Sequence, residues 1–289
     1  MELIVPYVKG GGTDKRTRLV ARVLERELGH PINVVNRTGA VVGHTVIAEA
    51  KPDGETIGMI TGEIGMMHWF SQVTNLTWRD YTPLAVPYVE AAAIIVRGDA
   101  PFKSLADFLE VLRARPMRGS GSPDFGVWKF ALVGLLNAVG IDPRRIEWIP
   151  TISGEEGIEK VIAGEVDVAP VPMVEAPELI LAKKVRPLAT MDDVRHPKFP
   201  DVPTVKEAIG VSWRVAHWRG VVGPAGLPFD VKTRLVAALR RVSVDPDFLE
   251  ECRANGFSLE WRFGGDFADY MRKDDEQFGG IITRFEEGQ

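Results

Sequence analysis

The sequence predicts an α/β protein with two lobes, each a mainly parallel sheet flanked by helices. Segments typical of strands alternate with segments typical of helices along most of the chain, and this alternation favours parallel sheets covered by helices. The chain has 289 residues, close to the size at which one hydrophobic core gives way to two. Two extended runs that end in Gly/Pro turns, residues 94–97 and 217–222, are candidate crossings between the lobes.

The strand candidates are short apolar runs bounded by turn-forming residues. They are residues 2–7, 32–36, 56–61, 91–97, 117–120, 146–150, 166–171, 185–190, 217–222 and 258–262. If both crossings are hinges, residues 1–97 and 217–289 form the first lobe and residues 98–216 the second. A ligand is then expected in the cleft between the lobes.

Several helices between these strands have ends that the sequence predicts. A helix with one apolar face ends at Gly29, and Asp245 with Pro246 begins another. Three pairs of a hydroxyl residue and an acidic residue three positions later resemble capping boxes. They are Ser104 with Asp107, Ser153 with Glu156, and Thr204 with Glu207.

The composition argues against several functional classes. Apolar residues make up 45% of the chain and charged residues 26%, as in ordinary globular proteins. The net charge is −5 and the basic residues are scattered, so neither nucleic acid nor an anionic membrane is favoured as a partner. Cys252 is the only cysteine, which rules out an internal disulfide. No apolar stretch approaches the roughly 20 residues that span a bilayer.

Three consecutive glycines, Gly10 to Gly12, lie between the first predicted strand and the first predicted helix. Thr13 and Asp14 follow them in the sequence. Such a turn leaves backbone N–H groups open and directs a helix N-terminus at the gap, which favours an anion. The Lys-Ser/Thr of a P-loop and the G-x-G-x-x-G spacing of a dinucleotide fold are both missing. A plain tight turn, with Thr13 or Asp14 as the helix cap, is the alternative.

The arrangement recurs at two further places. Residues 38–43 (TGAVVG) follow a predicted strand and lead into a helix, and so do residues 119–123 (GSGSP). Three loops of small residues, each before a helix, are typical of a receptor for a small carboxylate. Hydroxyl and N–H groups would bind the anion without a dedicated arginine.

At these residues the sequence resembles a known family, the substrate-binding proteins of tripartite tricarboxylate transporters, also called Bug receptors. The resemblance covers nearly the whole chain, and its strength lies in the joint order of motifs that are each weak alone. They are VPYxxGGGTD at 5–14, NRTGA at 36–40, PDGET at 52–56, GSGSP at 119–123, AGEVD at 163–167, RPLAT at 186–190, PDVPT at 200–204 and GPAGLP at 223–228.

The resemblance implies a type II periplasmic-binding-protein-like fold that closes over a small organic carboxylate and docks on membrane permease subunits. It implies no cofactor, no metal, a monomer, and a periplasmic or extracytoplasmic location, with a leader replaced by Met1. The ligand-binding positions that it implies are Tyr7, Gly11, Gly12, Thr13, Thr38, Gly39, Ala40, Gly43, Thr61, Ser120, Gly121 and Ser122.

Departures from the family pattern bear on the ligand. Thr38 stands where the family usually has proline, and Thr151 begins a segment where a Tyr-Lys-Gly run is common. Val171, Pro172 and Met173 replace an Asp-Asn pair that suits a ligand amino or hydroxyl group. We therefore expect the distal end of the ligand to be apolar or aromatic.

Lys15 and Arg16 occupy the first turn of the first helix, where basic residues oppose the helix dipole. They could face a ligand, a partner or water, and water is favoured. Asp14 is interpreted as a cap or loop tie, because its carboxylate would repel a carboxylate ligand. Met59, Met66, Met67 and Trp69 are interpreted mainly as core.

An α/β enzyme acting on a carboxylate or phosphate ester in the same cleft is the alternative function. The five histidines, at positions 30, 44, 68, 196 and 217, lack metal-ligand spacing. No G-x-S-x-G elbow is present, and Ser120 has no local base. A receptor that signals rather than transports would use the same site. We therefore expect a binding protein and not an enzyme.

Overall fold

The computed structural model describes residues 1–70, 73–121, 126–151 and 153–287. It divides the chain into two compact units. The first consists of Met1–Val89 and Trp218–Gly279, and the second of Glu90–His217 and Gly280–Gln289. The chain therefore passes between the units at residues 89–90 and 217–218, and again near its end at residues 279–280.

The sheet of the first unit has the strand order β11-β4-β10-β3-β1-β2. Its strands are β1 (Glu2–Val5), β2 (Asn33–Asn36), β3 (Thr56–Thr61), β4 (Tyr81–Ala91), β10 (Ala216–Pro224) and β11 (Leu259–Phe263). β1 pairs in parallel with both β2 and β3. β10 runs antiparallel to β3, and β11 antiparallel to β4. The carboxyl ends of β1, β2 and β3 consequently meet at one edge of the sheet, which we call the first carboxyl edge.

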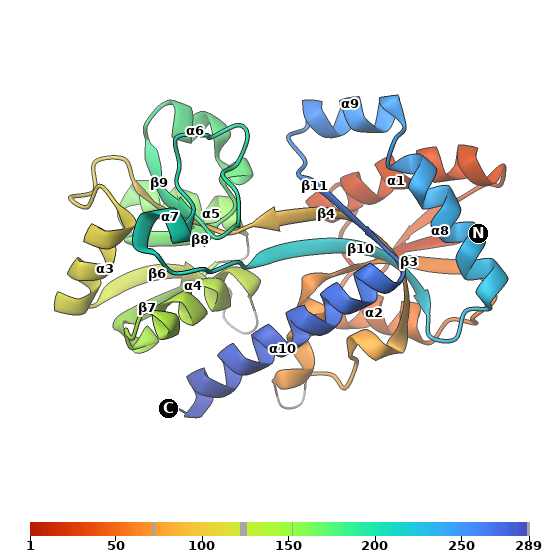
Figure 1. The fold of residues 1–289 in the computed structure, drawn as a ribbon, viewed down its shortest axis with the longest axis horizontal. Coiled ribbons are helices and arrows are strands. Elements are labelled where there is room, and N and C mark those ends of the chain that lie inside the picture. Colours follow the sequence, from red (N-terminus) through yellow and green to blue (C-terminus); the bar gives the residue numbers. More distant parts are fainter. Residues whose placement is uncertain (71–72, 122–125, 152, 288–289) are drawn as a thin grey trace. The chain divides into compact units, whose positions relative to one another are not determined.

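Helices cover both faces of this sheet, with α1 on one side and α2 on the other (Figure 1). The helices are α1 (Gly12–Leu28), α2 (Ala40–Ala48), α8 (Phe229–Val242), α9 (Pro246–Ala254) and α10 (Gly265–Glu287). Short 3₁₀ helices lie at Gly62–Gly65, Met67–Trp69 and Trp78–Asp80. α1 packs beside α8, and Leu24, Leu239 and Phe248 from α1, α8 and α9 share one buried core with the sheet. Burying this apolar area stabilises the unit by about 25 cal/mol per Å².

The sheet of the second unit has the order β7-β6-β8-β5-β9. Its strands are β5 (Ala93–Arg97), β6 (Met117–Gly121), β7 (Ile146–Pro150), β8 (Val168–Val171) and β9 (Val185–Thr190). β6 pairs in parallel with β7 and β8, whereas β5 is antiparallel to β8 and β9. The carboxyl ends of β6, β7 and β8 therefore share one edge, which we call the second carboxyl edge.

Four helices of the second unit lie between these strands in sequence, and α7 follows β9. They are α3 (Leu105–Ala114), α4 (Val127–Ala138), α5 (Gly154–Ala163), α6 (Pro177–Leu181) and α7 (Val205–Ile209), with 3₁₀ turns at Pro143–Arg145 and Met173–Glu175. α5 packs against β8 and β5, and Ile158 and Val161 from this helix belong to the buried core of the unit.

Most of the expected helix ends are confirmed. Both hydrogen bonds of a capping box are present at Ser104–Asp107 and at Thr204–Glu207. Gly29 ends α1 in the left-handed conformation with φ 63°, and the Asp245 side chain accepts from the Phe248 N–H at the start of α9. Ser153 caps α5 by accepting from the Glu156 N–H.

Strand β4 is absent from the strands that the sequence predicts. Pro83 and Pro87 interrupt this run, and proline usually argues against an inner strand because it cannot donate to the ladder. β4 nevertheless lies between β10 and β11 and is buried over most of its length.

The expectation of mainly parallel sheets is correct for β1–β3 and β6–β8 only. β5 and β10 run against their neighbours, so each sheet is mixed. β5, which the sequence analysis assigns to the first lobe, pairs within the second sheet, and the first passage between units is at Val89–Glu90.

Candidate functional site

The glycine loop connects β1 to α1 and is held by its own hydrogen bonds. Gly10 has φ +84°, a left-handed conformation that favours glycine, and its N–H donates to Asp14 Oδ2 at 2.8 Å. The Gly11 N–H donates to the Val8 carbonyl at 3.3 Å. Gly12 is exposed and begins α1, where the first N–H groups have no partner inside the helix. The loop is thus a tight turn that also leaves the N-terminus of α1 exposed.

Asp14 ties this loop to the next one. Its carboxylate accepts from Arg18 Nε and from Asn36 Nδ2, both at 2.9 Å, in addition to Gly10. Asn36 also donates to the Tyr7 carbonyl at 2.9 Å. Burial raises the pKa of Asp14, but the hydrogen bonds from Arg18, Gly10 and Asn36 outweigh it and lower that pKa below its usual value. The interpretation of Asp14 as a loop tie is confirmed; the N-cap of α1 is Gly11.

The second loop, between β2 and α2, lies at the same edge. Thr38 and Gly39 are exposed, and Gly39 has φ +113° at the N-cap of α2, which begins at Ala40. Gly43 has a packing role, because a Cβ at this position would lie 2.3 Å from the Cα of Pro6. Glycine here lets α2 approach the end of β1 closely.

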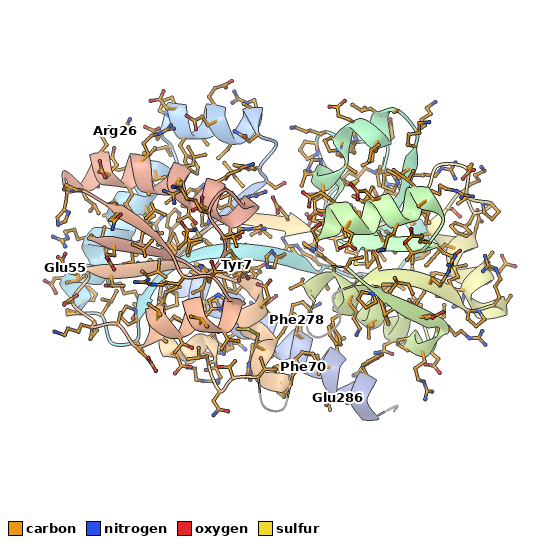
Figure 2. The ribbon with its side chains drawn as sticks, turned by 180° about the vertical axis from the view of Figure 1, so that it is seen from behind. Tyr7, Arg26, Glu55, Phe70, Phe278 and Glu286 are labelled. Carbon is orange, nitrogen blue, oxygen red and sulfur yellow. The ribbon has the colours of Figure 1, made fainter. Side chains whose placement is uncertain are left out.

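Tyr7 and Thr61 meet at the first carboxyl edge, with their hydroxyl oxygens 2.9 Å apart. Figure 2 shows Tyr7 at the opposite end of the sheet from Glu55. The Thr61 N–H donates to Nε2 of the fully buried His44 at 3.3 Å. His44 Nε2 therefore acts as an acceptor and carries no proton. His44 is a core residue that positions Thr61.

Tyr7 keeps its proton at this edge. Burial raises the pKa of its hydroxyl well above the usual value, and the negative charge of Glu63 raises it further, while hydrogen bonding from Thr61 and the positive charge of Arg219 lower it. Glu63 also forms a hydrogen bond with the Tyr7 side chain, and a carboxylate can only accept it. An acidic group therefore stands at the same edge as the hydroxyls.

Two arginines lie at the first turn of α1. Arg16 is only 8% exposed, its guanidinium lies 4.0 Å from the Phe257 ring centroid, and its Nη1 donates to the Gly12 carbonyl. The expectation that Arg16 faces water is wrong, because its guanidinium stacks on an aromatic ring that comes from the far end of the chain. Lys15 is exposed, as expected. The half-buried Arg219 of β10 donates from Nε to Thr13 Oγ1 at 3.1 Å. Arg219 is not among the site residues that the sequence predicts.

The predicted residues of the second unit gather at the second carboxyl edge. Ser120 and Gly121 end β6, and the Thr151 N–H donates to the Gly121 carbonyl at 3.0 Å. Ser120 is only 2% exposed, and its Oγ would lie 2.6 Å from a Cβ placed on Gly157 of α5. Ser122 lies outside the described residues.

A carboxylate of the protein itself lies at the N-terminus of α5. A Cβ on Gly154, the first residue of the helix, would fall 1.6 Å from Glu175 Oε2. This position suits the positive end of the helix dipole. The carboxylate of Glu175 therefore occupies the N-terminus of α5.

Val171 and Met173 are each 3% exposed and belong to the core of the second unit, beside the buried Pro172. The half-buried Trp128 packs on this core, and its ring lies 5.5 Å from that of His217. Unlike Val171 and Met173, the Trp128 side chain retains exposed surface at this edge. Trp128 is not among the predicted site residues either, and its position in the first turn of α4 is the one sequence signal that indicates it.

In the first unit, Met59, Met66 and Met67 are fully buried, which confirms them as core, whereas Trp69 is 39% exposed. Among residues 1–70, 73–121, 126–151 and 153–287, no group of three His, Cys, Asp or Glu side chains is placed to hold a metal ion. Within the same ranges, no helix has both the length and the apolar character needed to cross a membrane.

A groove of about 700 Å³ lies elsewhere in the second unit, lined by α3, α7 and the first residues of β9. β9 runs antiparallel to β5, which is itself antiparallel to β8, so the start of β9 lies away from the second carboxyl edge. The groove contains none of the predicted ligand-binding residues.

Comparison with known proteins agrees with the two sheets and their loops. Residues 17–286 match the model of the tripartite tricarboxylate transporter family receptor. The chain belongs to this family. Family members are solute-binding receptors, so the expectation that the protein is not an enzyme agrees with its family. The receptor is 26% identical to a protein of Pseudomonas sp. (strain P51) from the tcbD-tcbE intergenic region, over 98% of this chain and 85% of the relative.

Two solved structures show the fold of the receptor. A TctC solute-binding protein from Polaromonas, without ligand, has a TM-score of 0.88 and 25% identity over 98% of both chains. MatC from Rhodopseudomonas palustris, with bound malate, has a TM-score of 0.78 and 23% identity, again over 98% of both chains. The expected two-lobed periplasmic-binding-protein-like fold is confirmed.

Proposed function

We propose that this receptor captures a small organic carboxylate outside the cytoplasm and delivers it to the permease subunits of a tripartite tricarboxylate-type transporter. One observation carries the proposal: the glycine loop, the loop at Thr38–Ala40 and the Tyr7–Thr61 hydroxyl pair meet at the first carboxyl edge. Ligands of α/β proteins bind at the carboxyl ends of parallel strands. The malate bound by MatC supports the carboxylate class.

The N-terminus of α1 is the proposed anion-binding element. The N–H groups of Gly12 and Thr13 stand at the start of the helix. The Asp14 carboxylate already accepts hydrogen bonds from Gly10, Arg18 and Asn36. In the second unit, by contrast, Glu175 lies at the N-terminus of α5. The ligand carboxylate is therefore assigned to α1 and the Thr38–Ala40 loop.

The second unit is proposed to supply the rest of the ligand's contacts when the two units close. Ser120, Ser122 and Thr151 are the polar candidates and Trp128 the apolar one, in place of the core residues Val171 and Met173. The chain passages at Val89–Glu90 and His217–Trp218, which join the two units, are the proposed hinges. The distal part of the ligand is then apolar or aromatic.

A thermal-shift screen tests the function. The probes are a broad panel of aliphatic and aromatic carboxylates that includes malate, adipate and benzoate, each tested beside its neutral amide. A ligand that binds only the folded state stabilises it by about 2.7 kcal/mol at about 100 times its Kd, so a bound carboxylate raises the Tm by several degrees while its amide does not. If no carboxylate of a broad aliphatic and aromatic panel raises the Tm, the proposed function is wrong.

A further inference from the structure

We propose that the groove lined by α3, α7 and the first residues of β9 is a second ligand site, which binds a small organic anion with an apolar body. The groove has a volume of about 700 Å³, within the range of about 300–1,000 Å³ that small-molecule sites occupy. All of its lining belongs to the second unit. The inference goes beyond the proposed function, because the groove shares no residue with the proposed carboxylate site.

One part of the groove lining is apolar. It consists of Leu105, Ile180, Val185, Leu188 and Val202. Ile180 is half-buried, and the other four side chains are buried in the second unit. A lining of this kind removes hydrocarbon surface of a ligand from water, which favours binding without selecting a charge.

Three cations, Lys103, Lys183 and Arg186, line the same groove. Arg186 is half-buried, and it donates only to backbone carbonyls of the turn at residues 98–102. Both lysines are exposed. Within the described ranges, none of the three side chains forms an ion pair with a carboxylate. Their charges are therefore open to an anionic ligand.

The backbone of Lys183 supports a role for its side chain. Lys183 has φ +55° and is, among the residues that the structure describes, the one residue other than glycine in the left-handed region. It follows the end of α6 in a Schellman motif, where glycine is usual. Left-handed glycines do follow α1, α5 and α7. A lysine held in this conformation costs stability, and such strain is typical of residues kept for binding.

The acidic residues of the lining do not cancel the three cations. Glu207 accepts from Arg195 Nε at 2.8 Å, so a cation that is not part of the lining already balances its charge. Asp201, which is exposed, is the other acid of the lining. The groove therefore has a surplus of positive charge, which favours an anion over a neutral or cationic ligand.

The N-terminus of α3 is not the anion-binding element of this groove. The Asp107 carboxylate accepts from the N–H groups of Lys103 and Ser104, at 2.9 Å and 3.1 Å, and so occupies the start of the helix. We therefore assign the charged group of the ligand to the side chains of Lys103 and Lys183. Its hydrocarbon part is assigned to the apolar lining.

Octanoate is the probe, and octanamide is its uncharged counterpart. Both are titrated by calorimetry at low and high salt into wild type and into Gly12→Val, which is altered at the first carboxyl edge. The groove variants are the double variant Lys103→Gln with Lys183→Gln, and Lys183→Gly. Lys184→Gln is the matched control, because Lys184 is an exposed lysine next to Lys183 but is not part of the lining.

We expect octanoate to bind wild type and Gly12→Val alike. The double glutamine variant should bind octanoate at least about fivefold more weakly at low salt, with a smaller difference at high salt. Its affinity for octanamide should stay unchanged, and Lys184→Gln should change octanoate affinity less than about twofold. Lys183→Gly should lose affinity while its Tm rises, because glycine relieves the left-handed backbone.

Equal octanoate affinity with and without the two lysines would overturn the second site, as would the absence of octanoate binding by wild type. Loss of octanoate binding in Gly12→Val would place this ligand at the first carboxyl edge instead. Binding of a hexaglutamate peptide without binding of octanoate would replace the small anion by an acidic protein segment. Failure of the carboxylate screen at the first carboxyl edge would overturn the proposed function and leave the groove unaffected.

Discussion

Replacing Gly12 by valine separates the two roles of the glycine loop, a tight turn and an opening to an anion. Gly12 is the first residue of α1, and its φ lies outside the left-handed region. A Cβ at this position meets only Arg16 Nη1, at 3.2 Å, within 4 Å. This atom ends a long side chain and can shift, so the protein itself has room for the valine.

The magnitude follows from this geometry. We expect Gly12→Val to change the free energy of unfolding by less than about 1 kcal/mol, because a surface substitution without strain has a small effect. The valine side chain blocks the approach of a carboxylate to the N–H groups of Gly12 and Thr13. Loss of one or two hydrogen bonds to a charged group costs about 1.5–3 kcal/mol each, so the Kd rises at least tenfold (about 1.4 kcal/mol).

The assay is a denaturant melt and a calorimetric titration on one preparation, using the carboxylate found in the screen. Gly29→Ala is the control at the other end of the same helix. Its φ of 63° strains alanine, so this variant should lose about 1 kcal/mol of stability and keep its affinity. A well-folded Gly12→Val protein with wild-type affinity would refute the assignment of the anion to the N-terminus of α1.

Three further predictions test the loop tie, the second unit and the closure. The pKa of Asp14 is lowered in the folded state, so the stability that Asp14 contributes to the protein is complete above its unfolded-state pKa and is lost as the pH falls through its folded-state pKa. Asp14→Asn should therefore flatten the acid limb of a curve of unfolding free energy against pH. An unchanged acid limb would exclude the tie. Alanine at both Ser120 and Ser122 should lower carboxylate affinity at least about tenfold, and unchanged calorimetry would remove both from the site. The radius of gyration from small-angle scattering should fall on adding the bound carboxylate, whereas an equal radius would argue against closure.

The sequence predicts those features of the fold whose interacting residues are close together in the chain. Ser104 with Asp107 and Thr204 with Glu207 form the capping boxes that their spacing indicates, because both partners lie within one helical turn. β4 was missed for the opposite reason. Its prolines reduce the local strand signal, and its place in the sheet depends on β10 and β11, which are distant in sequence.

In the candidate site, too, the sequence predicts the residues in local patterns but not those whose contacts are distant in sequence. The residues of the glycine loop and of the Thr38–Ala40 loop could be found because glycine before a helix is a local pattern, and the parallel pairing of β1 with β2 brings the two loops together. Arg219 could not be found in this way, since its contact with Thr13 spans 206 residues. The sequence does not predict the burial of Arg16 either, because its stacking on Phe257 is equally long-range.

Burial decided the remaining cases. Val171 and Met173 stand at the expected strand end, but both side chains turn into the core of the second unit. Sequence alternation does not settle such a case, because a strand end in a covered sheet can be buried on both faces. Trp128, from the first turn of α4, retains exposed surface instead.

The central claim is reversible capture of a carboxylate without chemistry. It is tested most directly by titrating the wild-type chain with the best carboxylate of the screen and then recovering the ligand for NMR. The account predicts saturable one-to-one binding that the neutral amide does not reproduce, with the ligand recovered unchanged. Conversion of the ligand, or equal binding of the carboxylate and its amide, would contradict it.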